Sequence, residues 1–200
     1  DGSIDAHGIV VDTFREERQF VRFRNLTSVE SFSGEGDPEQ IIGSQRDVRI
    51  TTLKPTSSST ILSTGPLSSG GFVTFGVPPL TSAVARITWD GVGAPGIGLS
   101  VDLTRGGLDD RFLAQFLVTD LPVNVGFEVT DTSGNQASLS VTGLTQKRDL
   151  NYPFADFNQD PTNTADVDFT SVASVTMQID GTASLDAALG VLSTGYIPSA

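Results

Sequence analysis

The chain has no cysteine among its 200 residues. Disulfide bonds, thiolate nucleophiles, iron–sulfur clusters and cysteine-bound zinc are therefore excluded. Histidine is almost as scarce, because the single histidine, His7, lies in an N-terminal segment of glycine and aspartate. A Ser-His-Asp triad would depend on that segment, and no Gly-x-Ser-x-Gly, Walker or dinucleotide-binding motif is present. The sequence thus predicts a protein that is not an enzyme.

Long apolar runs are also missing, and none approaches the ~20 residues that a membrane-spanning helix needs. Basic residues are few, 12 against 24 acidic ones, which gives a net charge of −12 and argues against a nucleic-acid partner. The chain starts at Asp1-Gly2-Ser3 with no basic and apolar leader. We expect a mature extracellular or cell-surface protein of a prokaryote, with its signal peptide removed.

Convincing helical patterns are missing as well. Only the segment Leu108–Val118 has some helical periodicity, and its end fits a strand equally well. Alternating or β-branched segments bounded by Gly, Pro, Ser and Asp instead predict strands throughout. They are Ile9–Phe14, Gln19–Arg24, Arg46–Leu53, Thr60–Ser63, Gly71–Phe75, Ala83–Trp89, Gly98–Asp102, Phe112–Thr119, Val123–Thr130, Gln136–Thr142, Val172–Ile179 and Ala187–Leu192. This pattern predicts an all-β fold, a two-sheet antiparallel sandwich of the jelly-roll type.

The clearest local signal lies between Phe127 and Val141, where two alternating segments flank Asp131–Asn135. Gly134 and Asn135 tolerate the positive φ angles of a tight turn, so this stretch predicts a β-hairpin. We expect one domain over residues 1–200. Residues 1–40 hold two strand-like segments that would act as an N-terminal extension, pairing with the same or a neighbouring subunit.

Oxygen-bearing side chains alternate after the hairpin, and the predicted metal ligands are Asp156, Asn158, Asp160, Asp166 and Asp168. Side chains at every second position of a tight loop are what a hard cation such as Ca²⁺ takes as ligands. Pro161 and Val167 replace the turn glycine and the closing glutamate of an EF-hand, so that motif is excluded. The segment predicts a structural Ca²⁺ site, with an Asp/Asn-rich turn held by capping side chains as the alternative.

Flat polar aromatics are few, one Trp and two Tyr beside twelve Phe. Carbohydrate sites often stack sugars on such rings, and the candidate ligand residues here are Trp89, Asp90 and Tyr152. Trp89 ends an apolar strand, so a position in the core is its competing interpretation.

Several short segments follow one another from about Ile42 to the C-terminus. They are Ile42–Val48, Thr88–Gly91, Val101–Thr104 with Gly106 and Gly107, the Asp131–Asn135 turn, and Phe169–Asp180. In style they resemble the galactose-binding-like jelly-roll domains of exported bacterial proteins, which include many carbohydrate-binding modules. The resemblance implies two packed antiparallel sheets, often a structural calcium, and ligands at loop tips or on one concave sheet. It implies no particular activity.

These observations leave three functions open. The first is a non-enzymatic extracellular structural or adhesive protein that self-assembles by strand addition into a homo-oligomer, filament or surface layer. The alternative is a carbohydrate-binding module with a glycan as its partner. The third is a glycoside hydrolase, which would need two carboxylates roughly 5 to 10 Å apart.

Overall fold

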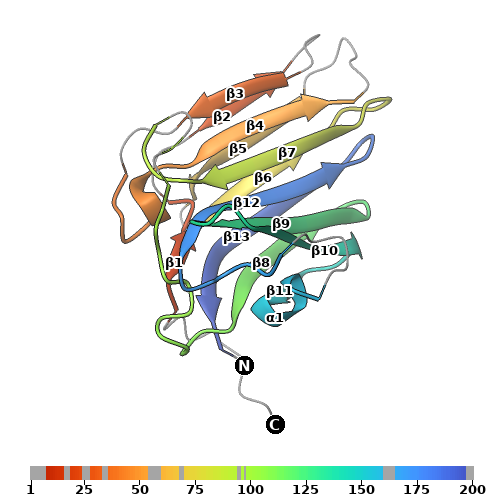
Figure 1. Ribbon diagram of the computed structural model, residues 1–200. Helices are drawn as coiled ribbons and strands as arrows, with labels where there is room; N and C mark the ends of the chain where they lie inside the picture. The colour runs from red at the N-terminus through yellow and green to blue at the C-terminus, as the bar shows by residue number, and fades with distance from the viewer. Residues whose placement is uncertain are drawn as a thin grey trace.

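The computed structural model describes residues 8–15, 19–23, 28–32, 36–53, 60–67, 70–93, 96, 98–159 and 165–196. Within these ranges, seven strands form one sheet and six form another, and the two sheets face each other (Figure 1). Every pairing between the strands is antiparallel. The predicted all-β, jelly-roll type of two-sheet sandwich is confirmed.

Sheet A has the order β11-β8-β13-β6-β5-β2, and β1 also pairs with β13. Its strands are β1 (Val10–Asp12), β2 (Phe20–Phe23), β5 (Thr60–Leu67), β6 (Gly70–Gly76), β8 (Arg111–Thr119), β11 (Arg148–Pro153) and β13 (Asp186–Gly195). Sheet B has the order β10-β9-β12-β7-β4-β3. Its strands are β3 (Ser28–Phe32), β4 (Asp47–Thr52), β7 (Ala83–Trp89), β9 (Val123–Asp131), β10 (Gln136–Leu144) and β12 (Val172–Gly181).

Two short helical segments accompany the sheets, η1 (Ile42–Ser44) and α1 (Phe154–Phe157). α1 lies beside β11 (Figure 1). No helix within the described ranges is both long enough and apolar enough to span a membrane.

The core lies between the two sheets and is filled by alternate residues of each strand. On β9, for example, Val125, Phe127 and Val129 are buried, while the residues between them face outward. Most of the chain's aromatic surface is used here. Phe112 packs on Phe127 with ring centroids 5.3 Å apart, and Phe154 stacks on Phe169 at 4.2 Å. Most of the described phenylalanines therefore serve packing, whereas Phe20 on β2 is 54% exposed.

Most predicted strands are confirmed to within a few residues, and Ala83–Trp89 matches β7 at both ends. The prediction of a strand over Gly98–Asp102 is wrong, since this stretch contributes only an isolated β-bridge from Val101 to Val172. The helical alternative over Leu108–Val118 is also wrong, because nearly all of that segment from Arg111 onward belongs to β8. Strands β3 and β11 were not predicted. The partner of β11 is β8, with two strands between them in the sequence, so local pattern gives little sign of β11.

The N-terminal strands pair within their own chain. β1 pairs with β13, β2 with β5 and β3 with β4. These strands therefore have partners within their own chain, and pairing with a neighbouring subunit stays a prediction.

A buried ion pair connects the N-terminal strand β1 with both sheets. Arg46 and Asp12 have no exposed surface, and the Arg46 guanidinium donates two hydrogen bonds of 2.9 Å to the Asp12 carboxylate. The Arg46 Nε donates to Gln19 at 2.9 Å, and Trp89 Nε1 donates to Asp12 at 3.0 Å. Arg46 also lies over the Phe14 ring. Burial of this pair is tolerable because its hydrogen-bonding groups find partners.

Removing one member of this pair would leave the other charge buried without its partner. We expect Arg46→Met to lower the free energy of unfolding by about 3–5 kcal/mol. Urea unfolding followed by fluorescence measures it directly, because Trp89 is the only tryptophan and contacts Asp12. Arg49→Met on exposed β4 surface is the matched control, and an equal loss in both variants would contradict the account.

Candidate functional site

The described residues of the predicted metal site make contacts of another kind. Among the described residues, no three His, Cys, Asp or Glu side chains come close enough together to hold a metal ion. Asn158 instead bridges to the Val167 backbone, accepting from its N–H at 2.9 Å and donating to its C=O at 3.2 Å. Asp168 accepts hydrogen bonds from the backbone and hydroxyl of Thr170. These contacts are those of a capped turn.

Three further residues were predicted as ligands, Asp156, Asp160 and Asp166. Asp156 and Asp166 are exposed. Asp156 adds a small contribution to the raised pKa of Arg111, which the hydrogen bond with Asp110 mainly causes. Asp160 lies outside the described residues, and binding of Ca²⁺ at this segment stays a prediction.

Asp131 holds the end of the hairpin to the segment that precedes β12. Its carboxylate accepts from the backbone of Ser133 and Asn135, from the Asn135 amide, and from the backbone of Asp168 at 3.1 Å. Burial acts to raise the carboxyl pKa, but these hydrogen bonds outweigh it and hold the pKa of Asp131 below its ordinary value of 3.8. The predicted hairpin is thus confirmed, and hydrogen bonds to the Asp131 carboxylate stabilise its turn.

The aromatic rings predicted to contact a ligand have no exposed face. Trp89 is in the core, where its ring packs against Phe14 at a centroid distance of 6.4 Å. Tyr152 is also fully buried, its hydroxyl donates to the Val125 carbonyl at 2.8 Å, and burial raises its pKa. Neither ring can stack on a sugar in this structure. Asp90 accepts from the Gly96 backbone at 3.0 Å in a loop, and its role as a ligand residue stays a prediction.

A groove of about 430 Å³ crosses the outer face of sheet B and is named here the sheet B groove. The strand register places Arg86, Gln178, Gly126 and Ser140 in one row across β7, β12, β9 and β10. Gly126 leaves this row without a side chain, and a Cβ added there would come within 3.1 Å of the Ser140 Cβ. A glycine in a strand interior often marks a place where another group approaches the backbone closely.

The side chains around the groove are almost all polar. The polar ones are Arg86, Asn124, Glu128, Ser138, Ser140, Thr142, Thr176, Gln178 and Asp180, and the apolar ones are Phe127 and Leu139. Arg86 Nε donates to Gln178 at 3.0 Å, and Gln178 in turn donates to Asp180 at 2.7 Å. Within the described part of the chain, the Glu128 carboxylate has no hydrogen bond or ion pair. The groove therefore holds an ordered polar ladder with an acceptor left for a ligand.

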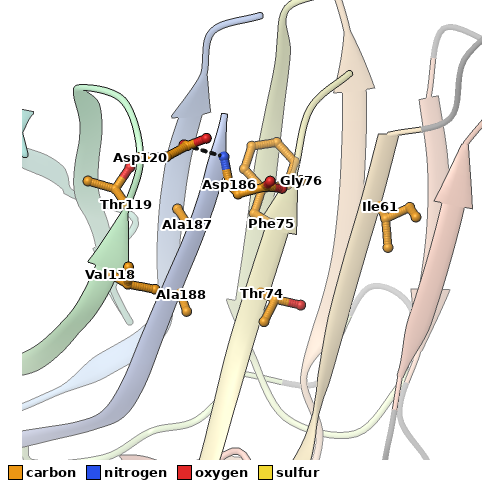
Figure 2. A pocket seen from close by; sticks show the side chains of 10 residues that line it. All are labelled: Ile61, Thr74, Phe75, Gly76, Val118, Thr119, Asp120, Asp186, Ala187 and Ala188. Carbon is orange, nitrogen blue, oxygen red and sulfur yellow. Dashed lines mark hydrogen bonds between the residues drawn. The ribbon is translucent and has the colours of Figure 1, made fainter. Parts of the chain in front are cut away.

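A second hollow, of about 500 Å³, lies on the opposite face of the sandwich, the outer face of sheet A. Figure 2 shows Val118, Ala188, Thr74 and Ile61 on four adjacent strands around it. A glycine again opens the surface, because Gly76 lies between Asp186 and Ile61 in the register. We name this the sheet A hollow.

The two sites differ in their hydrogen-bonding groups. The sheet B groove has donors in Arg86, Asn124 and Gln178 and acceptors in Glu128 and Asp180. The charged side chains of the sheet A hollow are two carboxylates, Asp120 and Asp186, and no described residue that lines it is basic. The first site suits a ligand that both donates and accepts hydrogen bonds.

Sequence reasoning missed the groove residues, although the strands that carry them were predicted. In β9 the outward positions are Asn124, Gly126 and Glu128, and in β12 they include Gln178 and Asp180. A glycine in an outward position between polar outward neighbours was a usable signal. The order in which β7, β12, β9 and β10 lie side by side could not be predicted from the sequence.

Comparisons with known proteins give structural likeness only. No known sequence family matches the chain, and no curated protein matches it by sequence. Among solved structures, it is similar to the family 11 carbohydrate-binding module of cellulosomal cellulase Lic26A-Cel5E of Clostridium thermocellum. The two share 9% identity over 97% of this chain and 98% of that one, with a TM-score of 0.42.

Two further structures show the same degree of likeness. A family 61 module in complex with β-1,4-galactotriose has 10% identity, covering 87% of this chain and 91% of its own, with a TM-score of 0.39. The structure of PfGH50B has 13% identity, 69% and 22% coverage, and a TM-score of 0.47. At such low values the function of this chain rests on the geometry of its own surfaces.

The Asp131 carboxylate predicts a pH dependence of stability. A pKa lowered by folding contributes stability above the ordinary value of 3.8, and this stability is lost as pH falls through the folded-state pKa. Asp131→Asn should therefore be less stable than wild type at about pH 7, and the gap should shrink at about pH 3. Urea unfolding of both proteins at both pH values measures this difference in the free energy of unfolding. Exposed Asp149→Asn is the control, and a gap independent of pH would contradict the assignment.

Proposed function

We propose that the chain is a non-catalytic carbohydrate-binding domain, and that the sheet B groove binds the glycan. The observation that carries the proposal is the mixed set of hydrogen-bonding groups around Gly126. Sugar hydroxyls both donate and accept, so a glycan in the groove can pair one hydroxyl with Arg86 and another with Glu128.

The rigidity of the groove supports this function. Its side chains stand on paired strands in the middle of sheet B, and the ladder from Arg86 through Gln178 to Asp180 holds three of them in place before a ligand arrives. Less conformational entropy is then lost on binding. Hydrogen bonding would supply the recognition here, since no described residue of the groove lining offers an exposed aromatic ring.

A hydrolase is less well supported by the same groove. Its two carboxylates are Glu128 and Asp180, and Glu128 lies opposite Thr176 on β12. Four residues separate Thr176 from Asp180, which places the two acidic positions about 13 Å apart along the sheet. That is wider than the ~5–9.5 Å between carboxyl groups in most glycosidases, and Gln178 lies between them.

Self-assembly finds less support than glycan binding. The N-terminal strands that would be donated to a neighbour already pair with β13, β5 and β4 of the same chain. Assembly through the outer edges of the sheets stays a prediction. Many polymeric glycans lie outside cells, so the proposed function is consistent with the expectation of an extracellular protein.

A glycan array followed by calorimetry on the best ligand tests the proposal. We expect Arg86→Ala and Glu128→Gln each to weaken binding about tenfold or more, because each removes a hydrogen bond to a charged group. Both side chains lie on the surface, so the free energy of unfolding should change by no more than about 0.5 kcal/mol.

Arg148→Ala and Glu39→Gln serve as matched controls, because both residues are exposed and neither lines the groove. Unchanged affinity in the groove variants, or equal losses in the controls, would contradict the assignment of the site. An array with no bound glycan would contradict the function itself.

A further inference from the structure

The sheet A hollow is a separate site with a different chemistry. Two rows of outward residues form it, one of Val118, Ala188 and Thr74 and the other of Asp186, Gly76 and Ile61. Gly76 is not in a strained conformation, and a Cβ there would meet only the Asp186 carboxylate, at 2.9 Å. Absence of that Cβ opens the centre of the hollow.

Two carboxylates lie at one end of the hollow, that of Asp120 beside the Asp186 backbone N–H and that of Asp186 extending toward Gly76 (Figure 2). Asp120 Oδ1 accepts from the Asp186 backbone N–H at 2.7 Å, which holds the start of β13 against the end of β8. Within the described residues, the Asp186 carboxylate has no hydrogen bond or ion pair. Since no described lining residue is basic, the negative charge at this end is not compensated locally.

The hollow has acceptors but almost no side-chain donors. Thr119 donates its hydroxyl proton to the Leu121 carbonyl at 2.5 Å, and Thr74 points its hydroxyl at the Ser63 carbonyl at 3.5 Å. The lining contains no Asn, Gln, Lys or Arg among the described residues. A ligand must then supply the donors itself, and an ammonium group has three donors and no acceptor.

Apolar surface surrounds the carboxylates. Val118, Ala188 and Ile61 form the walls, and a neighbouring depression of about 310 Å³ shares Ile61, Gly76 and Asp186 and continues to Pro78 and Pro79. An aliphatic chain can cover these side chains while its charged end reaches Asp186.

We propose that the sheet A hollow binds a primary ammonium group carried on an aliphatic chain, with Asp186 and Asp120 as its acceptors. Such a group occurs in free alkylamines and in lysine side chains. This site is independent of the glycan groove, which lies on the other outer face.

Titration of the intact chain with n-pentylammonium, followed by methyl and amide NMR, tests the proposal. We expect saturable shifts at Val118, Ala188 and Ile61, with a dissociation constant on the order of 1–10 mM for so small a ligand. Added salt should weaken the binding, because the carboxylates are exposed. Equal binding of 1-pentanol or pentanoate, or no shifts up to about 50 mM ligand, would overturn the proposal.

Variants locate the site. Asp186→Asn should weaken binding about three- to fivefold, and Gly76→Val should abolish it by filling the hollow. Asp166→Asn, an exposed acid outside the hollow, should leave binding unchanged. Equal weakening by Asp166→Asn would show a general charge effect and overturn the site. Asp186→Asn should retain any glycan binding of the wild type, which separates this test from that of the groove.

A second arm distinguishes the sources of the ammonium. If Nα-acetyl-lysine methylamide binds as tightly as n-pentylammonium does, the result would identify lysine side chains of a partner protein as the ligand. Binding of n-pentylammonium alone would identify free amines, because the added amide groups would then be excluded. Both outcomes support the proposal.

Discussion

Strand alternation is the constraint on which this structure depends. Each strand gives one side to the shared core, so a residue such as Phe127 faces inward and its neighbours Gly126 and Glu128 face outward. Any function carried by the sheets must then use their outer faces. On both faces a glycine in an outward position opens the surface, Gly126 in sheet B and Gly76 in sheet A. The same local device thus produces two sites, and the neighbouring side chains determine their different chemistry.

The buried ion pair helps to hold the tryptophan in the core, away from both sites. Asp12 and Arg46 need hydrogen-bonding partners in the core, and the indole of Trp89 supplies one of them. Tyr152 in the same way gives its hydroxyl to a core carbonyl. With Trp89 and Tyr152 in the interior, the sheet B groove is lined mainly by polar side chains on strands. A groove that works by hydrogen bonds is consistent with that use of residues.

Much of the fold could be predicted because it depends on local pattern. Alternation marked β7 and β9, and the Asp131–Asn135 turn marked the hairpin. The sites could not be predicted, because they depend on which strands are neighbours. Arg86 and Gln178 are in contact across β7 and β12, although 92 residues separate them in sequence. Local pattern was also ambiguous for oxygen-rich segments, since the alternation that suggested metal ligands at Asn158 and Asp168 equally describes the turn caps observed.

The central claim is that a glycan lies in the sheet B groove, and the most direct measurement is a map of backbone amide NMR shifts with a bound oligosaccharide. The account predicts that the largest shifts fall on Gly126, Glu128 and Gln178, in the floor and walls of the groove. Amides of sheet A should remain unperturbed. Shifts that gather instead at the loops around Asp90 or over the sheet A hollow would contradict the assignment of the groove as the glycan site.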